Sequence, residues 1–454
     1  MTTTPIISSI PRFWNAPSFK LLAIAFLILL LLIPQNMLTG LIHEREFYKS
    51  EATMQVTEKW ASAQTIAGPM LKIPIERTEL IDKELHKIQS AYYILPEKFQ
   101  ANMAMETETR KKGFYNVPVY TSINDFKGEF LAAEIEKIKK SNEIILWKDI
   151  EMVMGIQDLK GIVGIPKLNV NGASLELSPA NNDVSSGLKM MKASFPIEES
   201  AIANKGSFSF ELSATIKGTN QMNLIPVGKS TKAELSGNWP HPGFEGAFLP
   251  MSHSINEEGF TAQYEVSHFN RAFAGILLSP FDPLVLQETM AIQMVVPADE
   301  YQLGMRAVKY CVLVIILIFM SLFLYESITR TNVHIIQYLL IGAAIIVFYA
   351  LLIALSEVIG FTGAYISASI ATILLIHLYM YSIVSKKRVN WLLSGIQCII
   401  LCFIAIVIHA QEMSLLMGSF GLFITLAAIM YTSRKIDWGF SGGSPQKLKE
   451  SLME

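Results

Sequence analysis

The chain has 454 residues, of which 51% are hydrophobic and only 17% are charged, and its mean hydropathy is +0.37. Soluble domains carry about 25% charged residues, so this composition excludes an ordinary soluble protein. The formal net charge of −2 gives no reason to expect a nucleic acid partner. Charged residues are scarce at 21–42 and after about residue 308, which indicates a globular domain between membrane segments.

The first apolar run, residues 21–42, is long enough to cross a hydrocarbon core of about 30 Å as a helix. Arg12 and Lys20 precede it, as basic residues precede the apolar region of a secretory signal peptide. The end of the run stays apolar and shows no small-x-small cleavage site. We therefore expect an uncleaved anchor helix at 21–42, preceded by a cytoplasmic N-terminus at 1–20.

Five more apolar runs, separated by short gaps, follow in the last third of the chain. They cover about residues 308–327, 336–356, 362–384, 391–409 and 413–433. Backbone polar groups cannot stay unpaired in lipid, so each run should be helical. The sequence predicts six transmembrane helices in all, with a five-helix bundle over 308–433 and a tail over 434–454.

Basic residues in short loops orient such a chain, because they stay on the cytoplasmic side. Arg330, the cluster 386–388 and Arg434 fall in alternate loops, on the same side as Arg12 and Lys20. The two short loops on the other side carry Glu357 and Glu412 and no Lys or Arg. The prediction is a multi-pass protein with both termini in the cytoplasm and residues 43–307 outside it.

Residues 43–307 have the pattern of a β-rich domain. Alternating or β-branched runs occur at 70–75, 91–95, 117–120, 207–212 and 291–296, and turn residues separate them. Period-two patterning with regular turns predicts a sandwich or a barrel-like fold. We expect a helical continuation of the anchor over 44–65 and a second helix near 125–140.

The three cysteines, Cys311, Cys398 and Cys402, all lie in apolar runs, and the large middle domain has none. A domain of this size can bury a core that needs no disulfides. Cys398 and Cys402 are four residues apart and so share one helix face. We expect them to be small packing residues.

Histidine patterns give no metal site. His43-Glu44 begins like the HExxH motif, but no histidine follows at the helical spacing that zinc requires. The spacings of His241, His253 and His268 match no metal template. We therefore expect no metal and no cofactor.

The string Gly228-Lys229-Ser230 resembles the end of a phosphate-binding loop. That motif needs an earlier glycine where this chain has Asn223, and it needs a helix to follow. A strand-like run follows instead, and no GxSxG elbow occurs elsewhere. The sequence thus predicts no catalytic residues and a protein that is not an enzyme.

The loop from Asn238 to Phe244, which reads NWPHPGF, is the most unusual string of the middle domain. Its two prolines fix the backbone, and Trp239 and Phe244 flank His241. A rigid aromatic loop could bind a partner through Trp239, His241 and Phe244. The same residues could instead form a buried corner of the fold.

Ionisable residues are few inside the apolar runs. His377 lies within the fourth predicted span, and Glu357 lies near the outer end of the third. Charged groups at depth are costly and usually face the bundle interior, so both are candidates for an intramembrane function. For His377 the alternative is a histidine bonded to a neighbouring helix. Glu357, and Glu326 near the inner end of the second span, can instead reach the membrane interface and need no special role. A proton relay would need several such groups.

Asp299, Arg306 and Lys309 cluster where the second predicted span begins, together with Tyr301 and Tyr310. Basic and aromatic residues at this level anchor helices at the membrane interface, which is the role we predict. The cluster could also couple the middle domain to the bundle.

Several strings together resemble the CreD family of bacterial inner-membrane proteins, nearly end to end. They are GPMLKIP (68–74), LPE (95–97), RKKGFYNVPVY (110–120), NWPHPGF (238–244), FLP (248–250), DEYQL (299–303), RAVKY (306–310), QYLLIG (337–342), LSEVIGF (355–361) and KIDW (435–438). The resemblance implies an envelope integrity protein of the inner membrane, linked to envelope stress responses and colicin tolerance. It implies no catalytic residues.

Three functions are consistent with these observations. The leading hypothesis is a non-enzymatic envelope protein whose periplasmic β domain binds an envelope component or a partner protein. The second is a transporter or channel component, suggested by the clustered spans and His377. The third is an envelope enzyme with an unrecognised site.

Overall fold

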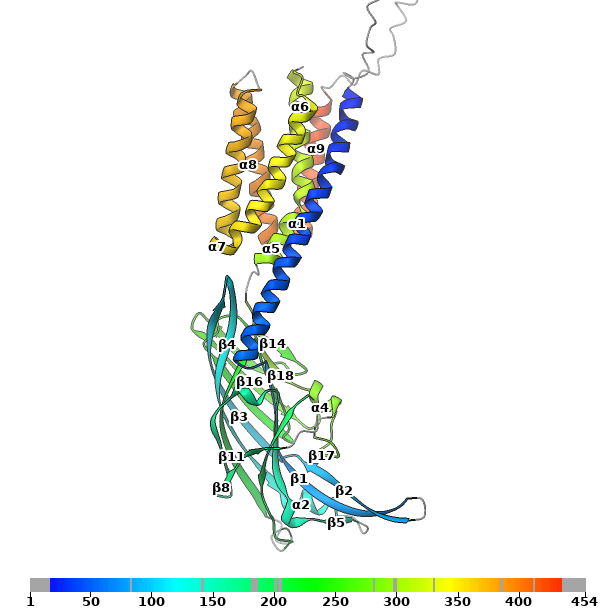
Figure 1. Cartoon of the computed structure of the whole chain (residues 1–454), viewed down its shortest axis with the longest axis vertical. Helices are drawn as coiled ribbons and strands as arrows, with labels where there is room; N and C mark the ends of the chain where they lie inside the picture. The colour runs from blue at the N-terminus through cyan, green and yellow to red at the C-terminus, as the bar shows by residue number, and fades with distance from the viewer. Residues whose placement is uncertain are drawn as a thin grey trace, which may run out of the picture. The chain divides into compact units, whose positions relative to one another are not determined.

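The computed structural model describes residues 17–81, 84–139, 143–180, 187–199, 202, 206–280, 282–296, 300–329, 331–383, 387–410 and 413–434. The chain divides into two compact units (Figure 1). The helical unit comprises Met1–Tyr48 and Ala298–Glu454, and the sheet unit comprises Lys49–Pro297. These divisions lie close to the predicted membrane boundaries at 42/43 and 307/308, which stay predictions.

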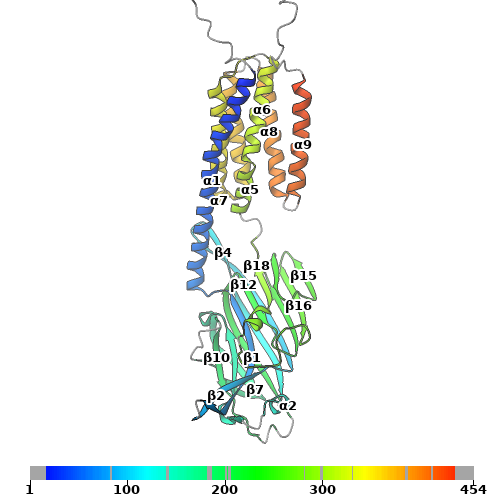
Figure 2. The ribbon, with the colours of Figure 1, turned by 90° about the vertical axis from the view of Figure 1, so that its right-hand side faces the viewer.

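The helical unit consists of long apolar helices and a shorter amphipathic one (Figure 2). They are α1 (Pro17–Lys59), α5 (Glu300–Lys309), α6 (Cys311–Thr329), α7 (Ile335–Tyr381), α8 (Lys387–His409) and α9 (Ser414–Ser433). Within the described residues, α1, α6, α7 and α8 are long and apolar enough to cross a membrane. The structure therefore confirms membrane helices beside a large β-rich part, whereas the count of six spans is not confirmed.

The difference in count depends partly on α7, which covers two of the predicted spans. Its 47 residues would extend about 70 Å if straight, more than twice the hydrocarbon thickness. Gly360 interrupts it with φ 75° and ψ 161°, a conformation that is essentially restricted to glycine. Two helices thus meet at Gly360, close to the predicted gap between 356 and 362.

The sheet unit contains a ten-stranded and an eight-stranded sheet. The first consists of β1 (Gln64–Ile81), β2 (Glu84–Ile94), β5 (Glu143–Ile145), β6 (Glu151–Ile156), β9 (Ser178–Pro179), β10 (Lys189–Ser194), β12 (Gln221–Ile225), β14 (Pro242–Gly246), β17 (Ile276–Leu277) and β18 (Met290–Met294). The second consists of β3 (Lys98–Lys112), β4 (Tyr115–Leu131), β7 (Ile162–Val170), β8 (Ala173–Glu176), β11 (Ser207–Thr219), β13 (Ser230–Gly237), β15 (Ser252–Asn256) and β16 (Gly259–Ser267).

The strand order shows how distant segments meet. The first sheet runs β14-β18-β12-β1-β6-β10-β9, and β2, β5 and β17 pair outside this path. The second runs β15-β16-β13-β3-β4-β11-β7-β8. Each has one parallel pair, β1 with β12 and β3 with β13, and the other strand pairs are antiparallel. Short helices α2 (Ala132–Glu136) and α4 (Pro283–Gln287) connect strands.

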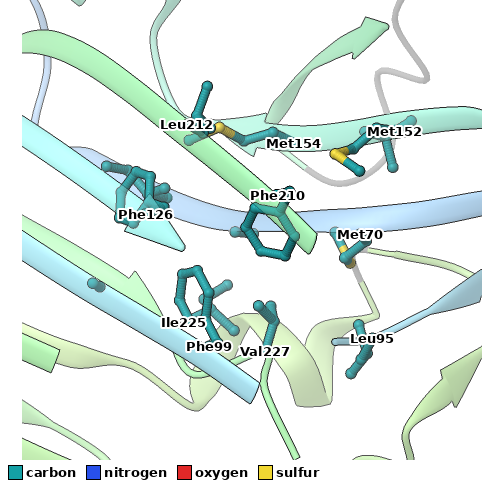
Figure 3. Close-up of a cluster of buried hydrophobic side chains, with 14 of the residues drawn as sticks. Met70, Leu95, Phe99, Phe126, Met152, Met154, Phe210, Leu212, Ile225 and Val227 are labelled. Atoms are coloured by element: carbon teal, nitrogen blue, oxygen red, sulfur yellow. The ribbon is translucent and has the colours of Figure 1, made fainter. Parts of the chain in front are cut away.

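One hydrophobic core joins the two sheets. Aromatic side chains from the second sheet, including Phe99, Phe126 and Phe210, are almost fully buried. They belong to the same cluster as Met70 and Met152 of the first sheet (Figure 3). Strands with alternating buried and exposed residues, such as β3 and β11, supply one face to this core. The β-rich domain is thus confirmed, and of the two predicted folds, sandwich or barrel-like, two sheets around one core correspond to the sandwich.

The helix predicted near 125–140 is wrong for most of its length. Residues up to Leu131 belong to β4, and only Ala132–Glu136 are helical. Phe126 and Phe130 are four residues apart, a spacing that fits one helix face as well as one strand face. Pairing with β3 on one side and β11 on the other makes this segment a central strand.

Replacement of Gly360 tests the break in α7. We expect Gly360→Ala to destabilise the full-length protein by about 1–3 kcal/mol, because alanine is strained at this φ and ψ. The nearest atom to an added Cβ is 3.9 Å away, so crowding does not contribute. Thermal unfolding in detergent measures the effect.

Gly363→Ala is the matched control, because Gly363 is helical and an added Cβ would make ordinary contacts at 3.6 Å. We expect it to be neutral or slightly stabilising. Equal losses for both variants would contradict a special role for the backbone at Gly360.

Candidate functional site

In the helical unit, a buried carboxylate on α6 binds α1. Glu326 forms an ion pair with Lys20 of α1, and its side chain is only 9% exposed. The Tyr338 hydroxyl of α7 donates a hydrogen bond to the other Glu326 oxygen at 3.1 Å. Three helices therefore meet at one charged group. A buried carboxylate needs such partners, because its desolvation is otherwise uncompensated.

Glu357 of α7 forms a second group of the same kind. Its Oε1 lies 3.6 Å from Arg45 Nε of α1 and accepts a 3.0 Å hydrogen bond from the Tyr301 hydroxyl of α5. Lys20 and Arg45 are separated by about 37 Å along α1. Cations near both ends of the anchor helix are thus matched by carboxylates of the other helices. Glu357, which the sequence suggested as an intramembrane functional residue, is thus observed as the ion-pair partner of Arg45.

The predicted candidate His377 bonds to the neighbouring helix α8. Its Nδ1 lies 2.7 Å from the Ser394 hydroxyl, and its backbone carbonyl accepts a 3.1 Å hydrogen bond from Asn390 Nδ2. The ring also packs on Trp391, with 4.6 Å between the ring centroids. This geometry matches the alternative reading of a histidine bonded between helices.

A small polar void lies between α6, α7 and α8, close to His377. It holds about 20 Å³ and is lined by Ser321, Asn390, Ser394 and Gln397 among apolar side chains. Asn390 Oδ1 and Gln397 Nε2 are buried there without a hydrogen-bond partner. A cavity of this size and polarity can hold one water molecule but no larger solute.

The predicted interface cluster is only partly described. Arg306 and Lys309 lie on α5, Lys309 is exposed, and Arg306 is half-buried. Asp299 lies outside the described residues, so a cluster of all three is not observed. Tyr301 of the same helix is buried and binds Glu357.

In the sheet unit, residues 238–241 form a corner of the fold, and Pro242–Phe244 begin strand β14. The Trp239 indole donates a 2.9 Å hydrogen bond to the Val295 carbonyl, and Phe244 packs on Phe260 with 6.3 Å between centroids. Both aromatic side chains are half-buried against the core, whereas His241 is exposed. This packing favours the structural reading of Trp239 and Phe244.

Two open hollows lie on the solvent-facing side of the eight-stranded sheet. The larger holds about 560 Å³ between β3, β4, β11, β13, β15 and β16, and the smaller holds about 290 Å³ over β3, β13 and β16. Residues that line the larger one include Glu106, Thr121, Ile123, Thr215, Ser236, Asn238, Ser254 and Thr261. Sequence reasoning missed this face. The sequence pattern that could have identified it is the series of hydroxyl and amide side chains at alternate positions of these strands.

The remaining patterns from the sequence can be located in the described residues. Lys229 of the string at 228–230 pairs with Glu97 at 2.8 Å, and strand β13 begins at Ser230. No helix therefore follows that string. Within the described ranges, no group of three or more His, Cys, Asp or Glu side chains could hold a metal ion.

Two comparisons with known proteins each match nearly the full length of the chain. Residues 16–439 match the family model described as Inner membrane protein CreD. The chain is 30% identical over 434 residues to the Inner membrane protein CreD of Escherichia coli strain K12. That alignment covers 94% of each of the two chains.

Removal of the Glu326 carboxylate tests its role in holding α1. Breaking a buried ion pair costs about 3–5 kcal/mol, and because Lys20 is 20% exposed we expect Glu326→Ala to cost about 2 kcal/mol. Tyr338→Phe removes one hydrogen bond and should cost about 1 kcal/mol. Thermal unfolding of the full-length protein in detergent gives both values.

The exchanged pair Lys20→Glu with Glu326→Lys is the control, and we expect it to recover part of the loss. Glu357→Ala should cost less than Glu326→Ala, because Arg45 is 41% exposed. The reverse order would show that the Glu326 group does not hold α1.

Proposed function

The chain belongs to the CreD family of inner membrane proteins, and we propose that it is a non-enzymatic envelope protein of the bacterial inner membrane. Its sheet unit lies in the periplasm and binds an envelope component or a partner protein. Its helical unit anchors that binding domain. The family resemblance supports a role in envelope integrity and in envelope stress responses.

The proposed topology has six spans with both termini in the cytoplasm. The break at Gly360 supports counting α7 as two spans, and the 20-residue helix α9, whose middle part is apolar, is long enough for another. Lys20 before the anchor and Lys387 and Arg388 at the start of α8 are then cytoplasmic, in agreement with the positive-inside rule. Glu357 is at the opposite side.

The observation that carries the binding function is the pair of hollows on the eight-stranded sheet. Their volumes, about 560 and 290 Å³, are in or near the range of ligand sites. Hydroxyl and amide groups such as Thr121, Ser254 and Gln263 donate and accept hydrogen bonds without fixed charge. Apolar side chains such as Ile123 and Phe260 line the larger hollow as well, so the lining favours a ligand with both polar and apolar groups, such as a saccharide or an extended peptide.

The non-enzymatic character is supported by the residues at the same face. Lys232 pairs with Glu265 at 3.3 Å, and the described lining of the larger hollow contains the carboxylates Glu106 and Glu258 but no histidine or cysteine. A serine or threonine in the described lining therefore has no histidine of that lining to activate it as a nucleophile.

Photo-crosslinking from Ile123 tests the binding face. Ile123 is 54% exposed and lies in the larger hollow, so a photoreactive residue at this position should capture a discrete protein or glycan adduct in living cells. Ile165 is the matched control, because it is 80% exposed on β7 of the same sheet and outside both hollows.

We expect the adduct yield from position 123 to exceed that from position 165 several-fold, as measured by mass spectrometry. If both positions gave the same adduct yield, or none, while the protein is folded and inserted, the hollows would not be the binding face.

The second function is a transporter or channel component, and the polar group around His377 is the observation that favours it. The void beside it has room for one water molecule and no larger solute, so this group would have to act on protons. We expect His377→Gln, which can still bond to Ser394, to leave the envelope phenotype unchanged. Loss of that phenotype at a normal membrane level would favour transport over anchoring.

A further inference from the structure

The β3–β4 hairpin extends beyond the rest of its sheet. β3 and β4 pair with each other as far as Lys112 and Tyr115. β13 follows β3 only to Met105, and β11 follows β4 only back to Val119. The last residues of the hairpin therefore have no neighbouring strand. We call residues 110–115 the hairpin tip.

The hairpin tip combines positive charge with exposed aromatic surface. Arg110 pairs with Glu108 at 2.6 Å and stacks on the Trp60 ring at 4.5 Å, so its charge is partly compensated. Lys111 and Lys112 are exposed and form no ion pair with the described residues. Phe114 is 70% exposed. The tip therefore presents two exposed cations and an exposed aromatic ring close together in the chain.

The hairpin projects from one end of the sheet unit. At this end the chain enters the unit from α1, and it leaves the unit after β18 toward α5 and α6. Thr57 in the last turn of α1 lies 3.3 Å from Thr219, oxygen to oxygen. Asn220, the next residue, donates its backbone N–H to Pro118 at the base of the hairpin, and its carbonyl accepts from Met294 N at 2.8 Å. Met294 ends β18, the last strand before α5. The tip also lies beside the end of α1 (Figure 2), as the Arg110–Trp60 contact requires.

We propose that the hairpin tip binds phospholipid headgroups of the membrane in which the chain is anchored. Lys111 and Lys112 contact lipid phosphates, and Phe114 enters the interfacial layer between headgroups and acyl chains. Aromatic and basic side chains favour this layer, and basic residues are attracted further by anionic lipids. The paired strands satisfy their own backbone groups, so the tip can enter this layer without exposing unpaired N–H or C=O groups. This inference is independent of the hollows.

Quenching of a fluorophore at position 114 tests the proposal. The full-length chain carries Phe114→Cys labelled with an environment-sensitive dye, with the exposed Cys398 and Cys402 replaced by alanine. It is reconstituted in nanodiscs of phosphatidylcholine, with or without phosphatidylglycerol, that contain lipids spin-labelled near the headgroup. We expect strong quenching, which increases several-fold with phosphatidylglycerol and decreases with added salt.

Phe269→Cys is the matched control. Phe269 is 86% exposed and follows Ser267, which pairs with Ser230 beside Lys98, at the start of β3. The length of β3 places it roughly 46 Å from the tip. The dye at this position should not be quenched. Lys111→Glu with Lys112→Glu should abolish most of the quenching at position 114 and leave the thermal midpoint unchanged.

Three results would overturn the proposal. The first is a dye at position 114 that is no more quenched than at position 269 in either lipid. The second is quenching that survives the double lysine substitution. The third is a single protein adduct from a photoreactive residue at 114 in cells, without quenching in nanodiscs, which would make the tip a protein-binding site.

Discussion

Placement of charged groups in apolar surroundings is the constraint on which the helical unit depends. Lys20 and Arg45 lie near opposite ends of the anchor helix, and each contacts a carboxylate of another helix, Glu326 or Glu357. A tyrosine hydroxyl donates to each carboxylate. In lipid, packing alone discriminates weakly between positions of one apolar helix against another. Paired charges fix both the rotation and the axial position of α1, because a shifted helix would leave them unpaired.

The sheet unit is under a different constraint, because its core forms in water from strands that are far apart in the chain. Both parallel pairs, β1 with β12 and β3 with β13, join segments separated by more than a hundred residues. Burial of aromatic and methionine side chains between the sheets offsets the entropy of closing such long loops. The faces turned away from this core are free to carry polar side chains, and there the two hollows lie.

The residues that first drew attention in the sequence turn out to have mainly structural contacts. Trp239 bonds to the backbone before α5, and His377 bonds to α8. Rare residue types attract attention because each needs a specific partner when buried, and a structural partner satisfies this need as well as a ligand does. The candidate binding features are instead ordinary residues in an unusual place, namely hydroxyl groups along neighbouring strands and two lysines with a phenylalanine at a hairpin tip.

The sequence by itself determined the apolar helices, the β-rich middle part and the family, because hydropathy and period-two patterns are local properties of the chain. It located strands such as 207–212 correctly for the same reason. It could not distinguish a helix from a strand at Phe126 and Phe130, whose spacing fits both. Only the tertiary structure decided that Glu326 contacts Lys20, that β3 lies beside β13, and that the β3–β4 hairpin extends beyond its neighbouring strands. These features depend on contacts between segments distant in the chain, which no local pattern encodes.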